Sequence, residues 1–197
     1  MSYFTSNTPN IIKESSRGYD TFRIVDQMLL DREIACVGPI DAEATDSLCL
    51  QLRYLQKVDP DAEITIFINS PGGEVQSGLA ILDTMKAISC PVRTVCLGMA
   101  ASMAALLFVA GDQRDMLPHS RVMIHDPLVT GGVGGSALQV QTLSQNLMRT
   151  REITAQVLAE HTGKTLEEIY AVTAQDSYYE APEAIEFGLA DRVIDKL

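Results

Sequence analysis

Gly98-Met99-Ala100-Ala101-Ser102-Met103-Ala104-Ala105 is a run of small residues with a single serine at its centre. A strand-like apolar run, Val92 to Leu97, precedes it, and a helix-compatible apolar run, Ala104 to Ala110, follows it. A hydroxyl at a strand-to-helix turn lies at the positive end of the helix dipole, among backbone N–H groups without partners in the helix. This position suits a nucleophile, but it also suits an N-cap residue in a tightly packed crossing. These residues alone favour the two interpretations of Ser102 equally.

The composition is that of a globular protein. The 197 residues are 46% apolar and 21% charged, which predicts a single domain with a hydrophobic core. The net charge of −11 argues against nucleic acid and against an anionic membrane surface as partners. No apolar run is long enough to span a bilayer, and residues 1–10 lack the pattern of a secretory signal peptide. A cytoplasmic location is therefore expected.

The four cysteines are spread along the chain without a paired motif. They are Cys36, Cys49, Cys90 and Cys96, and none belongs to a CxxC pair. Zinc sites and dithiol redox motifs use closely spaced pairs, so neither is predicted. We expect free thiols in a reducing compartment, and no metal or cofactor.

The chain divides into a polar N-terminal segment and one α/β domain. Residues 1–18 are expected to be mobile, and residues 19–197 are expected to form a single domain. Within that domain, short runs rich in β-branched residues alternate with helix-compatible runs, which is typical of an α/β fold. Strands are predicted at 33–38, 64–68, 92–97, 122–124 and 193–194, and helices at 42–57, 75–88, 137–160, 165–171 and 182–187, with a further helix opening at Ser102.

A glycine pair directly follows the strand predicted at 64–68. Gly72 and Gly73 allow backbone conformations closed to other residues and let a ligand approach their N–H groups. If this turn lies beside Ser102, N–H groups from both turns converge on one developing oxyanion. The alternative is a tight strand-to-helix turn with Pro71 at its corner. A phosphate cradle is a third option, but no Walker lysine follows and Glu74 would repel phosphate.

Three histidines compete for the role of general base. His161 is predicted at a helix C-terminus, where a cation is favourable for structural reasons, and His119 lies in a polar loop. His125 ends an apolar strand, which is the placement expected of a site residue, although a buried core histidine remains the alternative. The residues alone do not identify the carboxylate that would orient His125. Asp176 lies in a loop from which it can reach a site, but spacing alone does not single it out, and Asp126 is too close in sequence to be the obvious partner.

Several motifs follow the pattern of one family in the same order, over about Ile11 to the C-terminus. They are Asn69-Ser70-Pro71-Gly72-Gly73, Gly98-Met99-Ala100-Ala101-Ser102-Met103, Leu117-Pro118-His119-Ser120-Arg121-Val122-Met123-Ile124-His125, His161-Thr162-Gly163, and Ala181-Pro182-Glu183-Ala184 with Phe187-Gly188-Leu189. With them the chain resembles the proteolytic subunit of the ATP-dependent Clp protease, the ClpP family, as a divergent paralogue. The resemblance implies a crotonase-like ββα superhelix with a protruding handle helix, which would be Ala137 to Glu160.

The same resemblance implies a serine endopeptidase. Ser102 matches the nucleophile, His125 the general base and Asp176 the acid that orients the histidine. The backbone N–H groups of Gly73 and Met103 match the oxyanion hole.

The resemblance also implies a substrate and partners. Substrate, an unfolded polypeptide, would add as a strand beside Gly72 to Val75, with Leu128 also in contact. The implied partners are further copies or related subunits, in two stacked seven-membered rings, and an AAA+ unfoldase that delivers substrate, directly or through a partner ring.

Two departures from the family's pattern lie near the predicted site. The position before Asp176 is Gln175, where family members usually carry an arginine that pairs across rings with an acidic handle residue. The handle here supplies Gln139 and Gln141, so that charge pair is predicted to be missing. The stretch after His125, residues 126–132, carries an apparent insertion.

A third departure concerns the outer pocket that docks the unfoldase's hydrophobic loop. At the aligned positions this chain keeps Phe67 but has Thr65, Ala87 and Asp115 in place of mostly aromatic residues. A polar or smaller pocket buries less apolar area, at about 25 cal/mol per Å². The departures raise the hypothesis of a conditionally active or regulatory subunit of a mixed-ring protease. A crotonase-like acyl-CoA enzyme is a further alternative, which the motif-matched Ser102, His125 and Asp176 disfavour.

Overall fold

Five parallel strands form the centre of the structure. The computed structural model describes residues 9–16 and 18–197. The parallel strands lie in the order β3-β4-β5-β6-β9, each hydrogen-bonded to its neighbours. Their bounds are β3 Glu33–Val37, β4 Ile64–Ser70, β5 Val92–Ala101, β6 Gln113–Met116 and β9 Arg192–Val193. The α/β class predicted from the alternating pattern is therefore confirmed.

The long strand β5 has two successive neighbours along one of its edges. Residues 93–96 pair with β6, whereas residues 99–101 pair in parallel with β7 (Arg121–Ile124). On its other edge, β7 pairs with β8 (Ser177–Glu180), which runs antiparallel to it. The end of β5 is thereby followed in the sheet by β7 and then by β8, which comes from a distant part of the chain.

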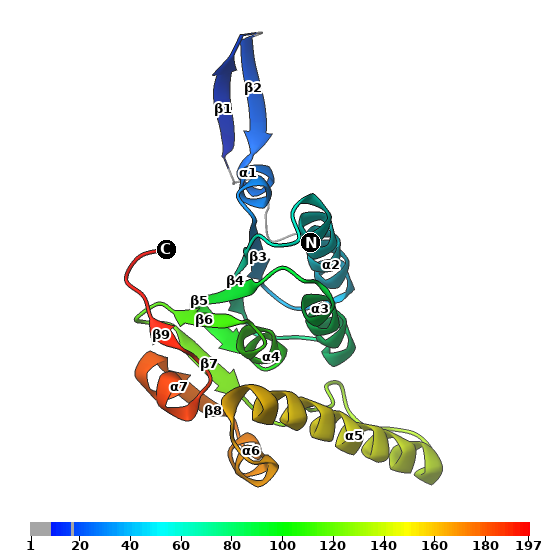
Figure 1. The fold of residues 1–197 in the computed structure, drawn as a ribbon. Coiled ribbons are helices and arrows are strands. Elements are labelled where there is room, and N and C mark those ends of the chain that lie inside the picture. The colour runs from blue at the N-terminus through cyan, green and yellow to red at the C-terminus, as the bar shows by residue number, and fades with distance from the viewer. Residues whose placement is uncertain (1–8, 17) are drawn as a thin grey trace.

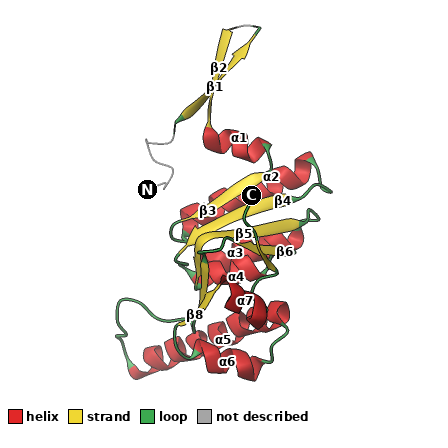
Figure 2. Ribbon diagram, turned by 90° about the vertical axis from the view of Figure 1, so that its left-hand side faces the viewer, coloured by secondary structure: helices red, strands yellow, loops and turns green. Residues whose placement is uncertain are grey.

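Three helices cover one face of this sheet (Figures 1 and 2). They are α2 (Ala42–Val58), α3 (Val75–Ala87) and α4 (Met103–Val109). Helix α2 buries a stripe of leucines at helical spacing, and the carboxylate of its N-cap residue accepts a hydrogen bond from the third residue of the helix. All seven residues of α4 are buried, so the helix that follows Ser102 lies inside the core.

The predicted handle is the longest helix, α5 (Ala137–Thr162), and it extends beyond the sheet (Figure 1). A capping box between Ser136 and Gln139 begins it, and Gly163, with φ 72°, ends it in the left-handed conformation common after a helix. Only the C-terminal half of α5 contributes buried residues. The chain then forms α6 (Leu166–Thr173) and α7 (Ala181–Phe187), close to the predicted bounds.

A β-hairpin precedes the domain and stands away from it (Figure 2). Strand β1 (Asn10–Ser15) pairs antiparallel with β2 (Gly18–Arg23), and α1 (Ile24–Leu30) leads into β3. The expected mobile segment 1–18 therefore contains a regular strand from Asn10, and its residues 1–8 and 17 lie outside the described residues. The hairpin escaped prediction because its side chains are mostly exposed and lack a buried apolar face.

All four cysteines are free thiols, as the spacing predicted. Burial raises the pKa of Cys36 to about 12 and that of Cys96 to about 11. In residues 9–16 and 18–197, no helix is long and apolar enough to cross a membrane.

A buried carboxylate ties β9 to the rest of the sheet. Asp115 on β6 is fully buried, and its two oxygens accept hydrogen bonds from Arg93 and Arg192 at 2.7 Å and from Gln113 at 3.0 Å. Burial acts to raise the pKa of Asp115, but these hydrogen bonds outweigh burial and hold the pKa below its ordinary value of 3.8. A lowered pKa in the folded state means that ionised Asp115 stabilises the fold above about pH 4.

Asp115→Asn is expected to lower the free energy of unfolding by about 3 kcal/mol at pH 7, because it leaves Arg93 and Arg192 without their shared counter-charge. The difference in free energy of unfolding between the wild type and this variant should shrink as the pH falls through the lowered pKa of Asp115, since Asp115 is then protonated. Urea unfolding at pH 7 and at pH 3 measures both effects. The exposed Asp46→Asn on α2 is the control; an equal loss in the two variants would contradict the expectation.

Candidate active site

Ser102 occupies a strained turn between β5 and α4. Its φ of 54° and ψ of −122° are unusual for a non-glycine residue, and its N–H donates to Met123 O at 2.8 Å. The residue stands at the N-cap position, but its side chain makes no capping hydrogen bond. The N-cap interpretation therefore does not account for the hydroxyl, which points elsewhere.

Strand register brings His125 to this hydroxyl. Ala101 on β5 pairs with Met123 on β7. Ser102 therefore follows β5 at the same edge of the sheet at which His125 follows β7. The His125 Nε2 atom lies 2.8 Å from Ser102 Oγ. The side chain of His125 is 15% exposed, so the ring is mostly shielded from solvent.

Register on the other edge of β7 supplies Asp176. Ile124 pairs antiparallel with Ser177, so the residue after Ile124 faces the residue before Ser177. Asp176 Oδ1 lies 3.0 Å from His125 Nδ1. Because an ionised carboxylate only accepts hydrogen bonds, Nδ1 donates to Asp176 and Nε2 accepts from the Ser102 hydroxyl. The three side chains form one hydrogen-bond chain in which the serine proton can move to the histidine.

The other histidines are not placed for this chemistry. His119 is exposed in its loop. His161 lies in the last turn of α5, where burial lowers its pKa and the nearby cations Lys86 and Arg114 lower it further. Its backbone carbonyl, rather than its ring, accepts a hydrogen bond from Arg114 at 2.9 Å. Of the three, only His125 lies between a serine hydroxyl and a carboxylate.

The glycine turn after β4 lies against the serine turn. A Cβ atom on Gly72 would lie 2.6 Å from Ala101 O, 2.8 Å from Ser102 Cβ and 2.9 Å from Met103 N. Its φ of 91° also requires glycine. The two turns predicted to meet are therefore in contact, and only a residue without a side chain fits at their junction.

The backbone N–H and C=O groups of Gly73 point away from Ile40, its neighbour in an isolated parallel bridge. Ile40 N–H donates to Gly72 O at 2.9 Å, and Ile40 O accepts from Glu74 N–H at 2.8 Å. In such a parallel bridge the residue between the two partners points its own N–H and C=O to the opposite side. The N–H of Gly73 is thus directed away from Ile40. The N–H of Met103, the first residue of α4, belongs to the helix-terminal groups that have no intrahelical partner.

The residues predicted to contact the substrate, Gly72 to Val75 and Leu128, lie in two different settings. The extended backbone beside Ile40 ends at Glu74, because Val75 is already the first residue of α3 and packs against the core. The segment available for pairing is therefore shorter than the predicted Gly72 to Val75. Leu128 lies in the loop after His125 and is 59% exposed.

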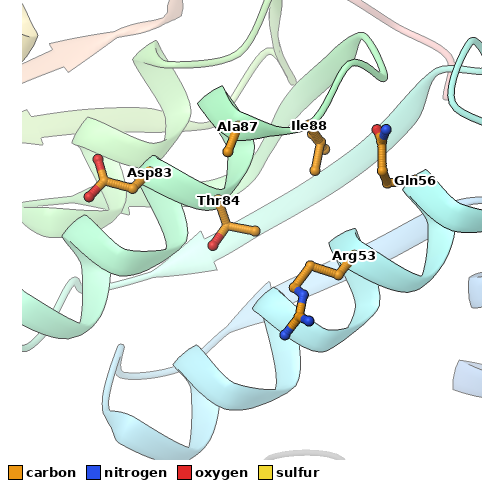
Figure 3. Close-up of a pocket in the computed structure, with 6 residues that line it drawn as sticks. All are labelled: Arg53, Gln56, Asp83, Thr84, Ala87 and Ile88. Atoms are coloured by element: carbon orange, nitrogen blue, oxygen red, sulfur yellow. The ribbon is translucent and has the colours of Figure 1, made fainter.

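The structure also locates the residues that depart from the family's pattern. Gln175 is exposed beside Asp176, and the side chain of Gln139 accepts from Ser136 N–H at 2.8 Å within the α5 cap. Ala87 lines an open groove between α2 and α3 (Figure 3), together with Arg53, Gln56, Asp83, Thr84 and Ile88. Thr65, Phe67 and Asp115 do not line this groove. Within the described residues, no cluster of three metal-ligating side chains is present.

Comparison with known families covers almost the whole chain. The model of the family described as Clp protease matches residues 16–197, a range that includes both turns and all three members of the hydrogen-bond chain. The mostly parallel sheet, the helices on its face and the projecting α5 agree with the fold that the sequence resemblance implied. On this match, the chain belongs to the Clp protease family.

Proposed function

We propose that this chain is a serine endopeptidase in which Ser102 is the nucleophile, His125 the general base and Asp176 the group that orients His125. The hydrogen-bond chain from Ser102 Oγ through the imidazole to Asp176 carries the proposal. Membership of the Clp protease family implies a peptidase, and the geometry supports this particular assignment of roles.

Each proposed step uses a group that lies at or beside the Ser102 turn. Ser102 Oγ attacks the peptide carbonyl carbon while His125 Nε2 takes the hydroxyl proton. The N–H groups of Gly73 and Met103 stabilise the resulting oxyanion. His125 then gives its proton to the leaving amine, the C–N bond breaks, and an acyl-enzyme remains on Ser102. Water, deprotonated by His125, hydrolyses the acyl-enzyme by the same steps in reverse order.

The substrate fitting this site is an extended, unfolded polypeptide. The backbone of Gly73 faces away from Ile40, so a peptide can pair with it as an added strand. Recognition through backbone hydrogen bonds depends little on the substrate's side chains. Leu128, which is exposed in the loop after His125, is the side chain proposed to contact the peptide beside the scissile bond.

We further propose that the chain assembles into two stacked seven-membered rings that receive polypeptides from an AAA+ unfoldase. The exposed half of α5 carries large apolar side chains, of which Leu138 is 74% exposed and Met148 57% exposed. Apolar side chains gathered on a projecting helix favour association with a second subunit. Analytical ultracentrifugation tests this part of the proposal independently of catalysis.

The test of the catalytic assignment is covalent labelling. A fluorophosphonate probe reacts with activated serines, so the wild-type protein should be labelled and Ser102→Ala should not. The variant should also lose hydrolysis of short peptides and of an unfolded protein. Labelling of Ser102→Ala at the wild-type rate, or no labelling of an assembled wild-type protein, would refute the assignment.

A conditionally active subunit of a mixed ring is the second candidate. Two observations favour it: the exposed Gln175 offers no charge beside Asp176, and Asp115, at a position aligned to the docking pocket, is a buried carboxylate paired with two arginines. Peptidase assays of the protein alone and mixed with a more typical Clp subunit distinguish the candidates. Full unfoldase-driven degradation by the protein alone would exclude dependence on a partner ring.

A further inference from the structure

The carboxylate of Asp126, the residue after His125, is held by two other elements. Its Oδ2 accepts a hydrogen bond from Arg151 Nε at 2.6 Å, and its Oδ1 accepts from Thr173 Oγ1 at 2.7 Å. Its backbone N–H donates to Thr173 O at 2.7 Å. The end of β7 is therefore attached to α5 through Arg151 and to α6 through Thr173.

The same contacts fix the chain that leads to Asp176. Thr173 is the last residue of α6 and precedes Asp176 by three residues. Just beyond, Ser177 Oγ donates to Val172 O at 2.6 Å, which closes the intervening turn. Asp126 and Thr173 thus join the segment that carries His125 to the segment that carries Asp176. The His125 and Asp176 side chains, which lie 3.0 Å apart, are therefore carried by two segments that this junction connects.

Arg151 is itself held in place. Its guanidinium carbon lies 4.0 Å from the centre of the Tyr170 ring, so the cation stacks on an aromatic face of α6. The side chains of Arg151 and Asp126 are 25% and 31% exposed, and an ion pair with this partial shielding is stronger than one at the open surface. Arg149, two residues earlier on α5, is exposed and makes no ion pair among the described residues.

We propose that Arg151 and Asp126 are positioning residues, through which α5 holds His125 in line with Ser102 and Asp176. The proposal rests on the catalytic assignment above. Neither side chain is required to touch the substrate. Their effect is transmitted through the backbone on either side of the His125–Asp176 contact, so a displacement of α5 that separates Arg151 from Asp126 would loosen the site without unfolding it.

The test compares Arg151→Met with Arg149→Met, which removes the same charge from the same helix. We expect Arg151→Met to lower kcat for a short peptide about 10- to 100-fold with little change in KM, because a misplacement near 1 Å has effects of this size. Arg149→Met should retain wild-type kcat. Arg151→Lys should recover part of the loss, since lysine restores the charge but not the planar contact with Asp126 and Tyr170.

Repeating the comparison in a second variant, Asp176→Asn, distinguishes a positioning role of Arg151 from general structural damage. In Asp176→Asn the contact that Arg151 is proposed to preserve is already weakened, so adding Arg151→Met should reduce the fluorophosphonate labelling rate less than twofold. An equal loss in both backgrounds, or the same kcat in Arg151→Met and Arg149→Met, would overturn the proposal.

Two further checks keep the test decisive. If Arg151→Met does not assemble, Thr173→Val, which removes only the hydroxyl bound to Asp126, carries the same expectation, and an unchanged kcat in that variant would also overturn the proposal. Failure of the catalytic assignment gives a different result, because Ser102 in the wild-type protein would then not be labelled at all.

Discussion

His125→Ala is expected to lower kcat for peptide hydrolysis by about 10⁵- to 10⁶-fold, the range seen when a serine protease loses its base. The reason is the 2.8 Å contact between Nε2 and Ser102 Oγ, which provides the acceptor for the serine proton. KM should change little, because the ring contributes to the reaction rather than to backbone recognition. Initial rates with a fluorogenic peptide, at equal concentrations of assembled protein, measure the effect.

His119→Ala is the matched control, because it removes an exposed histidine of the same chain. It should retain wild-type kcat. More than about one hundredth of wild-type activity in His125→Ala would be incompatible with its role as general base.

The second large effect is expected from the glycine pair. Gly73→Ala would place a Cβ atom 2.1 Å from Ile40 O, and Gly72→Ala would place one 2.6 Å from Ala101 O. Both neighbours are backbone atoms, so the turn must move rather than a side chain. Since loss of one oxyanion donor costs about 10²- to 10³-fold in kcat, a displaced turn should cost at least as much in either variant.

The matched control for the glycine variants is Gly134→Ala. Gly134 lies in the loop before α5, where a Cβ atom would meet nothing within 4 Å. Peptide hydrolysis and thermal unfolding should be measured for all three variants. We expect losses of activity and of melting temperature in the two turn variants only, and wild-type kcat in Gly73→Ala would exclude its N–H as an oxyanion donor.

Elements with a strong local signal were predicted close to their observed bounds. Helix α2 has an N-cap aspartate and leucines at helical spacing, and α5 ends at a glycine with positive φ. Strand β4 is a β-branched run. Such features act within one element, so they need no knowledge of its neighbours.

The short strands β6 and β8 could not be predicted in this way. Each is only four residues long, which is too short for a clear alternation of apolar and polar residues. Each is extended because a neighbouring strand pairs with it. The consequence for the site is direct. Because β8 was not predicted, Asp176 was one of many carboxylates in predicted loops, and it was selected only through the family resemblance.

The sequence alone determined which residues could take part in the chemistry. The serine in its run of small residues, the glycine pair after a strand and the single histidine at a strand end are local patterns, and the structure brings all of them together. It also determined the α/β class and the family, because alternating periods and ordered motifs are properties of the linear chain.

Only the tertiary structure shows which carboxylate contacts which residue. Asp126, adjacent to His125 in sequence, turns toward Arg151 and Thr173, whereas Asp176, 51 residues away, reaches the imidazole. The physical reason is the register of β7 between β5 and β8, because pairing between strands from distant parts of the chain sets which side chains meet.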